Sequence, residues 1–231
     1  MKVLDKSTGD ARSRILAAAE ALFAVKGWDR TSMRELTAAA DVNIAAVNYH
    51  FRTKDQLVED LFDRLAGRVN EVRLLALDDC LREARERDQP PRLDAILRTF
   101  IGPYFNPVSG PHEGQLLARL VLQQRLQPTE VTERVYKRHF DPLARRYIDA
   151  FSAALPTIPI VEWYWRYTFM VSTVILTATD VAADNRLARL SGGKATATNK
   201  ELLEAYLLNF LGGGLLAASQ TGHSLFTTHR T

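Results

Sequence analysis

Apolar residues recur at helical spacing along almost the whole chain. In residues 11–27 they fall at i, i+1, i+4, i+7 and i+8, on one face of a helix: Ile15, Leu16, Ala19, Leu22 and Phe23. Asp10 is a candidate N-cap for this helix, and Gly27 is a candidate stop signal after it. No stretch alternates at period two over more than a few residues. The pattern therefore predicts an all-helical protein.

Capping patterns mark the starts of the next helices. Ser32 is followed three residues later by Glu35, and Thr53 is followed by Gln56 at the same spacing. In this arrangement the two side chains satisfy backbone amides at a helix start. Together with the apolar periodicity, the caps predict helices over residues 33–39, 44–51 and 54–87.

Turn-forming residues divide the rest of the chain into five longer helices. The predicted spans are 93–104, 113–126, 129–155, 160–183 and 200–211. Thr198 and Glu201 form another possible capping box, and Gly212–Gly214 is expected to end the last helix. The expected fold class is all-α with about nine helices. We expect a three-helix N-terminal domain over residues 1–55 and a helical C-terminal domain over residues 56–231.

Composition and charge narrow the function classes. The 231 residues are 46% hydrophobic and 25% charged, as in ordinary globular proteins. Residues 1–54 hold nine Lys/Arg against six Asp/Glu, which leaves 21 of each sign elsewhere and places the whole net charge of +3 in the N-terminal quarter. This surplus weakly favours a polyanionic partner.

The location expected from the sequence is the cytoplasm. Cys80 is the single cysteine, so it cannot form an internal disulfide, and a reducing compartment follows. The first residues lack the apolar segment of a secretory signal. The longest apolar run, residues 167–179, is shorter than the ~18 residues that suggest a membrane span. No membrane partner is therefore expected.

Two short helices joined by a tight turn, as in residues 33–51, match a helix-turn-helix, whose second helix enters the DNA major groove. At 100° per residue, Ile44, Val47 and Phe51 share one face, which we expect to pack inward. The outward face consists of two small residues and several polar or aromatic ones: Ala45, Ala46 and Tyr49, flanked by Asn48 and His50. Small side chains let a helix approach base edges. The alternative is that Tyr49 and His50 are ordinary surface or packing positions.

Residues 11–62 contain four recognisable features: "ALF" followed by "G" at the end of the first helix, "TSMREL", "YHF", and "TK" before an acidic residue. With these features the segment resembles the N-terminal domain of the tetracycline-repressor (TetR) family of transcriptional regulators. The resemblance implies that the third helix reads the major groove, and that the start of the second helix and the lysine opening the fourth contact phosphates. It places these residues at the DNA: Thr31, Ser32, Met33, Asn43, Ala45, Ala46, Asn48, Tyr49, His50, Thr53 and Lys54.

Asn48 departs from the family pattern, in which a leucine or tyrosine is common at this position. Its amide has the geometry to pair with adenine, which is worth about 1–3 kcal/mol, and the alternative is that it is merely solvated. Tyr49 and His50 are expected to contact phosphates or thymine methyl groups. Lys54 opens a helix, where free amides and a cation together favour phosphate oxygens.

The resemblance also implies a C-terminal domain for ligand binding and dimerisation. In that family the last two helices form a four-helix bundle with the same two helices of a second copy, related by a twofold axis. The candidate dimer residues are Val174, Tyr206, Leu207 and Phe210, and an internal core is the alternative for each. The candidate pocket residues are Phe100, Tyr104, Phe105, Leu117, Arg119, Leu120, Trp165, Arg166 and Phe169. Arg119 and Arg166 either meet an acidic ligand group, or they pair with glutamates or extend their charged ends outward to solvent. Residues 90–185 more loosely resemble the branch of the family that responds to long-chain fatty acids or their acyl-CoA esters.

The sequence offers no catalytic motif. P-loop, HExxH and GxSxG patterns are missing, and the histidines are not spaced like metal ligands, so no cofactor, metal or catalytic residue is predicted. The expected function is a homodimeric repressor that binds a near-palindromic DNA operator and responds to a small hydrophobic effector. Two alternatives remain open. One is a regulator whose C-terminal domain binds a protein partner or no ligand, and the more remote one is a helical-bundle enzyme.

Overall fold

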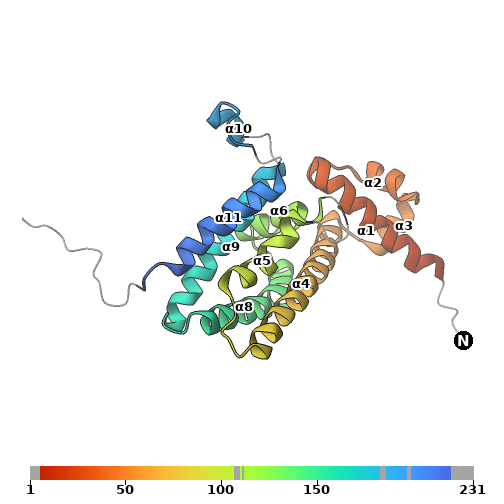
Figure 1. Cartoon of the computed structure of the whole chain (residues 1–231). Coiled ribbons are helices and arrows are strands. Elements are labelled where there is room, and N and C mark those ends of the chain that lie inside the picture. The colour runs from red at the N-terminus through yellow and green to blue at the C-terminus, as the bar shows by residue number, and fades with distance from the viewer. Residues whose placement is uncertain (1–5, 107–109, 111, 183–185, 197–198, 220–231) are drawn as a thin grey trace, which may run out of the picture.

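The computed structural model describes residues 6–106, 110, 112–182, 186–196 and 199–219, and its regular elements confirm the all-helical prediction (Figure 1). Within these ranges there are eleven α-helices and one π-helical turn. They are α1 (Lys6–Lys26), α2 (Met33–Ala40), α3 (Ile44–His50), α4 (Lys54–Glu86), α5 (Leu93–Phe105), α6 (Glu113–Leu126), α7 (Glu130–Val135), η1 (Tyr136–Phe140), α8 (Asp141–Ala154), α9 (Ile160–Ala182), α10 (Arg186–Ser191) and α11 (Lys200–Leu216).

The helices α1, α2 and α3 pack together at one end of the molecule (Figure 1). The predicted capping box of α2 is confirmed: the Ser32 amide donates to the Glu35 carboxylate at 2.9 Å, and the Glu35 amide donates to the Ser32 hydroxyl at 3.2 Å. Asn43 caps α3 by accepting from the Ala46 amide at 2.8 Å. Each cap satisfies a backbone donor that the first helical turn leaves unpaired. The turn between α2 and α3 is thereby fixed.

Two details of this end differ from the sequence prediction. The first helix begins at Lys6, so Asp10 lies inside it and is not its N-cap. Ile44 is 50% exposed, whereas Val47 and Phe51 are fully buried, because only the later part of α3 reaches the core beneath α1. The predicted stop at Gly27 is confirmed, since its positive φ of 79° suits a residue without a Cβ.

The long helix α4 connects this end to the rest of the protein. Its 33 residues span roughly 50 Å at 1.5 Å per residue. A buried stripe runs along it, and the helix packs against α1 near its start and against α5, α6, α7, η1 and α8 further along. One rigid element therefore contacts both the three N-terminal helices and the larger bundle.

The C-terminal bundle corrects three predicted boundaries. The single helix expected over 129–155 is interrupted by η1, where the Asp141 amide donates to the Tyr136 carbonyl. The physical reason is Pro142, which has no amide to donate to the carbonyl four residues earlier. The loop expected near residue 190 contains α10. The predicted cap Thr198 lies outside the described residues, and Asn199 caps α11.

The third correction concerns Gly212–Gly214, which lie inside α11 and do not end it. Leu211 and Leu215 flank them and are buried, so packing holds the helix through the glycines. Arg166 of α9 also donates to the Leu215 carbonyl, and to that of Ala217 at 2.7 Å, satisfying acceptors at the helix end. Tertiary contacts thus outweigh the low helix propensity of glycine. In the part of the chain that the structure describes, no helix is long and apolar enough to cross a membrane.

Candidate DNA interface and effector cavity

The outward face of α3 is open to solvent. Tyr49 is 77% exposed, and Ala45 and Asn48 are exposed beside it, while Ala46 and His50 are half-buried. The rings of Tyr49 and His50 meet edge to face, with centroids 5.1 Å apart. Because the opposite face is anchored in the core, these side chains are held at the surface in a fixed arrangement. The exposed Ile44 extends this face and was not expected there.

The start of α2 has one predicted contact residue that is not accessible. Thr31 is only 2% exposed, and its hydroxyl donates to the Gly27 carbonyl at 2.8 Å, which corrects its assignment to the DNA surface. Ser32 is exposed and Met33 is half-buried. Both lie at a helix N-terminus, where backbone amides favour anions.

Glu35 helps to order this helix start. The Lys26 ammonium, at 2.5 Å, and the Ser32 amide and hydroxyl hold the pKa of the Glu35 carboxyl down at about 2. The carboxylate is therefore charged at neutral pH and joins the end of α1 to the start of α2.

Thr53 and Lys54 begin the next helix. The Thr53 hydroxyl accepts from the Gln56 amide at 3.1 Å, so its acceptor is used to cap α4, as the Asn43 carbonyl is used to cap α3. In a capping box the Gln56 side chain would accept from the amide of the cap residue, Thr53. It accepts instead from the amide of the preceding residue, Arg52, at 3.3 Å. Lys54, the first residue of α4, is half-buried.

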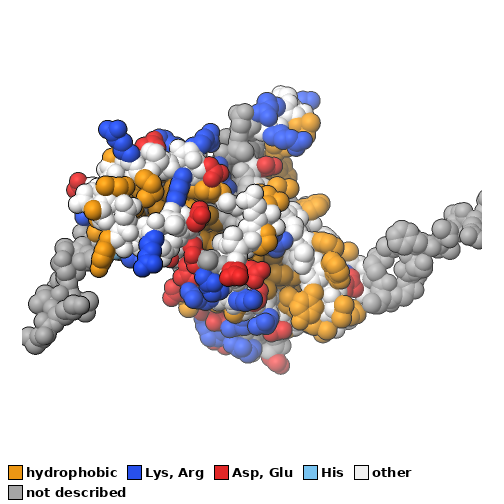
Figure 2. Space-filling view, turned by 180° about the vertical axis from the view of Figure 1, so that it is seen from behind, with side chains coloured by type: hydrophobic (Ala, Val, Ile, Leu, Met, Phe, Trp, Pro, Cys, Tyr) orange, Lys and Arg blue, Asp and Glu red, His pale blue; other side chains and the backbone are white. Residues whose placement is uncertain are grey.

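Cations around this surface fall into two groups, and Figure 2 shows several projecting from the N-terminal helices. Arg12 and Lys26 pair with Asp60 and Glu35, at 2.8 and 2.5 Å. In contrast, Arg34, Arg52 and Lys54 form no ion pair with any described residue, and Arg30 donates to the Lys26 carbonyl at 2.9 Å without pairing with a described carboxylate. Sequence reasoning selected Lys54 and missed the arginines, although the surplus of positive charge in this quarter pointed to such groups.

Two arginines tie the N-terminal helices to the bundle. Arg68 of α4 donates to Glu20 of α1 at 2.9 Å and to the buried carboxylate of Glu113 at the start of α6. Arg119 of α6 donates to the Ala24 carbonyl of α1 at 3.1 Å. Arg119 was a candidate for an acidic ligand group, with pairing to a glutamate or an outward position as the alternative, and the structure turns it toward α1.

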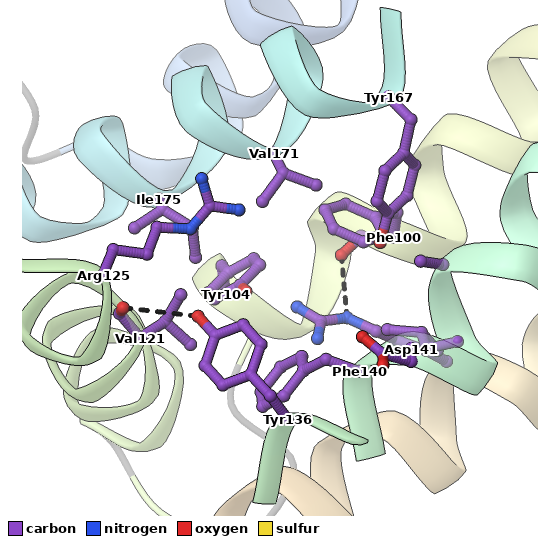
Figure 3. A pocket seen from close by; sticks show the side chains of 13 residues that line it. Phe100, Tyr104, Val121, Arg125, Tyr136, Phe140, Asp141, Tyr167, Val171 and Ile175 are labelled. Atoms are coloured by element: carbon purple, nitrogen blue, oxygen red, sulfur yellow. Dashed lines mark hydrogen bonds between the residues drawn. The ribbon is translucent and has the colours of Figure 1, made fainter. Parts of the chain in front are cut away.

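A cavity of about 130 Å³ lies within the bundle, between α4, α5, α6, α8, α9 and η1 (Figure 3). Its walls are mainly aromatic and aliphatic, with three charged side chains among them. The lining residues are Arg73, Phe100, Tyr104, Val121, Arg125, Tyr136, Phe140, Asp141, Leu143, Ala144, Tyr167, Val171 and Ile175. Phe100 and Tyr104 are the predicted pocket residues that the structure brings to this cavity.

The other predicted pocket residues lie elsewhere. Three of them are buried packing residues: Phe105, Leu117 and Leu120. Trp165 and Phe169 are largely exposed on α9 and line a separate, open groove of about 500 Å³ near the end of α11. Arg166 borders that groove and pairs with Glu162 at 2.5 Å, the glutamate alternative that the sequence left open.

Sequence reasoning missed all three charged lining residues, and Arg73 is the one among them that is buried. Its side chain is 0% exposed, with Nε donating to the Phe100 carbonyl at 3.1 Å and Nη1 donating to the Asn70 side chain at 2.8 Å. Nη2 has no hydrogen-bond partner among the described residues. The signal was available, because Arg73 lies four residues after Val69 and four before Leu77 on the apolar stripe of α4.

The tyrosines around the cavity are held in their neutral form. Burial raises the pKa of Tyr147 to about 12 and raises that of Tyr167 further. Burial also raises the pKa of Tyr136, partly offset by Arg125. At neutral pH these phenols are therefore hydrogen-bond donors, and the Tyr136 hydroxyl donates to the Val121 carbonyl at 3.4 Å (Figure 3).

Large apolar side chains are exposed along α9 and α11. This α9–α11 face consists of Ile160, Val161, Tyr164, Trp165, Phe169, Leu176, Leu202, Tyr206, Phe210 and Leu216. Figure 2 shows hydrophobic side chains gathered on the part of the bundle away from the N-terminal helices. Tyr206 and Phe210 were predicted at a dimer interface and belong to this face. Val174 and Leu207 are buried inside the protomer, which corrects their assignment to the interface.

Two models of known protein families match this chain, one over the N-terminal helices and one over the bundle. Residues 15–61 match the model of bacterial regulatory proteins of the tetR family, and residues 98–214, about half of the chain, match the tetracyclin repressor-like C-terminal domain. The chain belongs to the TetR family. Within this TetR-family protein, the first match covers the helix-turn-helix with the start of α4, and the second covers most of the bundle and every residue that lines the cavity except Arg73.

Individual relatives agree with this assignment. An HTH-type transcriptional repressor of Mycobacterium tuberculosis is 40% identical over 63 residues, which are 27% of this chain and 34% of that protein. The matches span about a quarter to a third of the length of the curated relatives.

Solved structures share the fold over most of the chain. A TetR-family regulator from Mesorhizobium loti has a TM-score of 0.60 and 18% identity, covering 91% of this chain and 98% of that one. A transcriptional regulator from Saccharomonospora viridis in complex with choline has a TM-score of 0.61 and 15% identity, covering 88% and 96%. At these identities the similarity establishes the fold alone.

Proposed function

We propose that this TetR-family protein is a homodimeric transcriptional repressor that binds a near-palindromic operator and changes its operator affinity when a small effector enters the cavity. The observation that carries the proposal is the exposed face of α3 beside three cations that form no ion pair with described residues: Arg34, Arg52 and Lys54. Base edges are read by side chains in the groove, while cations and helix amides fix the position on phosphates.

The α3 face suits reading of a major groove. Ala45 is small enough to let the helix backbone approach base edges. Asn48 presents an amide, whose bidentate pairing with adenine is worth about 1–3 kcal/mol. Ile44 and Tyr49 add exposed surface of the kind that contacts thymine methyl groups. In the proposed complex Ser32 and Lys54 lie on either side of α3 and contact phosphates.

A twofold dimer would cover the α9–α11 face. On α9 this face includes Val161, Trp165 and Phe169 at spacings of four residues, and on α11 it includes Leu202, Tyr206 and Phe210 at the same spacing. Two apolar helical stripes side by side support a four-helix bundle with a second copy. Two recognition helices in one dimer then require half-sites about 34–36 Å apart, or a multiple of that distance. A protein partner on this face is the alternative.

Helix α4 supports a coupling between cavity and DNA. Lys54 begins α4 at the proposed DNA surface, and Arg73 of the same helix lines the cavity, roughly 28 Å further along at 1.5 Å per residue. Arg68 lies between them and pairs with both Glu20 of α1 and Glu113 of α6. An effector shifts operator affinity to the extent that it prefers one position of α4 over the other.

The proposed effector has a mainly apolar body. The resemblance of residues 90–185 to the fatty-acid-responsive branch makes a fatty acid or acyl-CoA a candidate. The structural neighbour bound to choline makes a small ligand a second candidate. A cavity of about 130 Å³ holds roughly one benzene-sized group, so a long chain would require the surrounding helices to move apart.

The experiment is a selection of bound duplexes from a random DNA library by the purified protein. We expect enrichment of an inverted repeat, and loss of that enrichment in the double variant Tyr49→Ala/His50→Ala. The control for folding is that the double variant keeps the parent's helix content and elution volume. Absence of any enriched repeat, or equal enrichment by the double variant, would contradict the proposed function.

A further inference from the structure

We propose that the cavity is specific for a small organic anion, whose carboxylate or similar group pairs with Arg73 while its apolar body lies among the surrounding rings. This inference rests on the proposed function, in which the cavity receives the effector. It goes further by naming the effector's charge, its size and the residue that recognises it.

The first argument is the charge of Arg73. An arginine keeps its positive charge in proteins, and this one is fully buried. In the part of the chain that the structure describes, no carboxylate pairs with it, and its two hydrogen bonds go to the neutral oxygens of Phe100 and Asn70. A buried charge without a counterion is unfavourable, and an anion bound beside it removes that penalty.

The second argument is the position of the unused donor. Arg73 is a lining residue of the cavity, and its Nη2 is buried and has no partner among the described residues. A guanidinium edge presents N–H groups in a planar arrangement that matches a carboxylate. A carboxylate in the cavity would therefore accept a hydrogen bond from Nη2 and supply the negative charge that Arg73 lacks as a partner.

The other charged lining residues are Arg125 and Asp141, which carry opposite charges. Arg125 extends from α6 toward Val171 and Ile175 of α9 (Figure 3), and its side chain is exposed, so it lies where the cavity opens to solvent. Asp141 is the one acidic residue in the lining. Two cations against one carboxylate leave an excess of one positive charge, which suits a monoanion.

The size and walls of the cavity define the rest of the ligand. Its volume of about 130 Å³ is close to the roughly 150 Å³ of an apolar cavity that binds benzene. Rings from three elements surround this space: Phe100, Tyr104, Tyr136, Phe140 and Tyr167. A flat or short branched body of about six carbon atoms therefore fits, as in benzoate.

The same geometry disfavours a cationic ligand. Aromatic faces attract quaternary ammonium groups, and a cavity with several such faces is a natural site for them. Here the guanidinium of Arg73 already lies over two of these faces, 4.8 Å from the ring centre of Phe100 and 4.3 Å from that of Tyr104. A choline-like cation would have to displace it or bind beside a like charge.

The test uses the full-length protein in calorimetric titration and thermal unfolding, with sodium benzoate as the probe. Benzamide is the matched neutral control, choline chloride is the cationic control, and sodium chloride controls for ionic strength. We expect saturable binding of benzoate and a rise in the unfolding temperature. Benzamide should bind at least tenfold more weakly, and choline should give no saturable heat.

Variants then assign the binding to the cavity. Arg73→Gln should weaken benzoate binding at least tenfold. Since a buried substitution risks misfolding, Arg125→Gln provides a second test at an exposed residue, with several-fold weaker binding and an unchanged unfolding temperature without ligand. Arg145→Gln removes an exposed cation from α8 outside the cavity and should leave binding unchanged.

Three results would overturn the anion site. They are no benzoate binding at all, equal binding of benzamide or choline, and benzoate binding that survives both Arg73→Gln and Arg125→Gln. Operator affinity is measured separately with and without benzoate. Benzoate binding that depends on Arg73 but leaves operator affinity unchanged would keep the anion site and reject its role as effector site, so the two failures are distinguishable.

Discussion

Lys54 joins two sources of positive potential at one residue, because it is both a cation and the first residue of α4. Lys54→Ala should weaken binding to all DNA sequences and reduce the slope of log affinity against log salt concentration by about one per protomer. Fluorescence anisotropy over a series of salt concentrations measures both effects. The matched control is Arg85→Ala, an exposed cation near the other end of the same helix. An unchanged slope in Lys54→Ala would remove Lys54 from the phosphate contacts.

Glu35, at the junction of α1 and α2, makes a contribution to the stability of the fold that depends on pH. Its folded-state pKa of about 2, lowered chiefly by Lys26 from an ordinary 4.5, means that the carboxylate stabilises the fold above about pH 4.5. This contribution is lost as pH falls from about 4.5 through about 2, since protonation removes the charge. Glu35→Gln keeps an acceptor for the capping box without the charge.

The difference in unfolding temperature between the parent and Glu35→Gln should therefore shrink to nothing toward pH 2. It should also shrink with added salt, because the group is exposed and the Lys26 interaction is screened. Thermal unfolding across pH measures the difference, and an NMR titration of the Glu35 carboxyl measures its pKa. A carboxyl that titrates near 4.5 would refute the proposed electrostatic role.

Single residues also show where sequence patterns lose information. The wheel of α3 correctly predicted Tyr49 as exposed and Val47 as buried, because a short helix on a core has one inward face. It failed for Ile44, since apolar character does not say whether neighbouring helices reach a residue. Sequence reasoning also missed Arg73 of α4. An arginine is usually exposed, and only the position of Arg73 on the apolar stripe of α4 suggests that it is buried.

At the scale of elements, α6 comes very close to the backbone of α5 at Gly114. A Cβ built there would lie 2.5 Å from the Cα and carbonyl oxygen of Tyr104, which are backbone atoms and cannot rotate away. Gly114→Ala should therefore destabilise the protein by about 1–3 kcal/mol through overpacking. Because Tyr104 lines the cavity, the same change should also weaken ligand binding.

Gly102→Ala is the matched control, since Gly102 lies in α5 and a Cβ there meets nothing within 4 Å. This substitution should leave stability unchanged or raise it by about 0.4–1 kcal/mol, because alanine restricts the unfolded chain and favours helix. Urea unfolding of both variants measures the difference. Equal stability of the two variants would show that α5 and α6 separate easily, contrary to this packing.

Helix boundaries were predictable where local signals determine them. The span Glu113–Leu126 and the start of α4 at Lys54 agree with the prediction, since caps and turn residues mark them. The boundaries that failed depend on contacts between distant segments. Helix α11 continues through Gly212–Gly214 because Arg166 of α9 and buried leucines hold its end, and a sequence pattern does not contain that contact.

At the scale of the whole molecule, α4 is the element that the DNA surface and the cavity share. The sequence predicted this long helix and the family fold, because its periodicity and its N-terminal motif are continuous in the chain. Of the residues that line the cavity, only Phe100 and Tyr104 were predicted from the sequence. Its walls come from six elements, and their meeting point depends on packing angles that no single segment encodes.

The last prediction concerns the assembly itself. Phe210 is 71% exposed on the α9–α11 face, and a charge there would have to be desolvated in a dimer. Phe210→Asp should weaken dimerisation by at least about 2 kcal/mol, roughly 30-fold in the dissociation constant. Leu75→Asp, at an exposed leucine of α4, is the control and should remain dimeric.

Sedimentation equilibrium measures the dissociation constant, and anisotropy measures operator affinity in the same samples. If both half-sites must be held by one dimer, Phe210→Asp should lose affinity for the full operator while affinity for an isolated half-site is unchanged. A parent protein that is monomeric at micromolar concentration would reject the homodimer and leave the α9–α11 face to another protein partner. A variant that dimerises normally would instead move the interface away from α11.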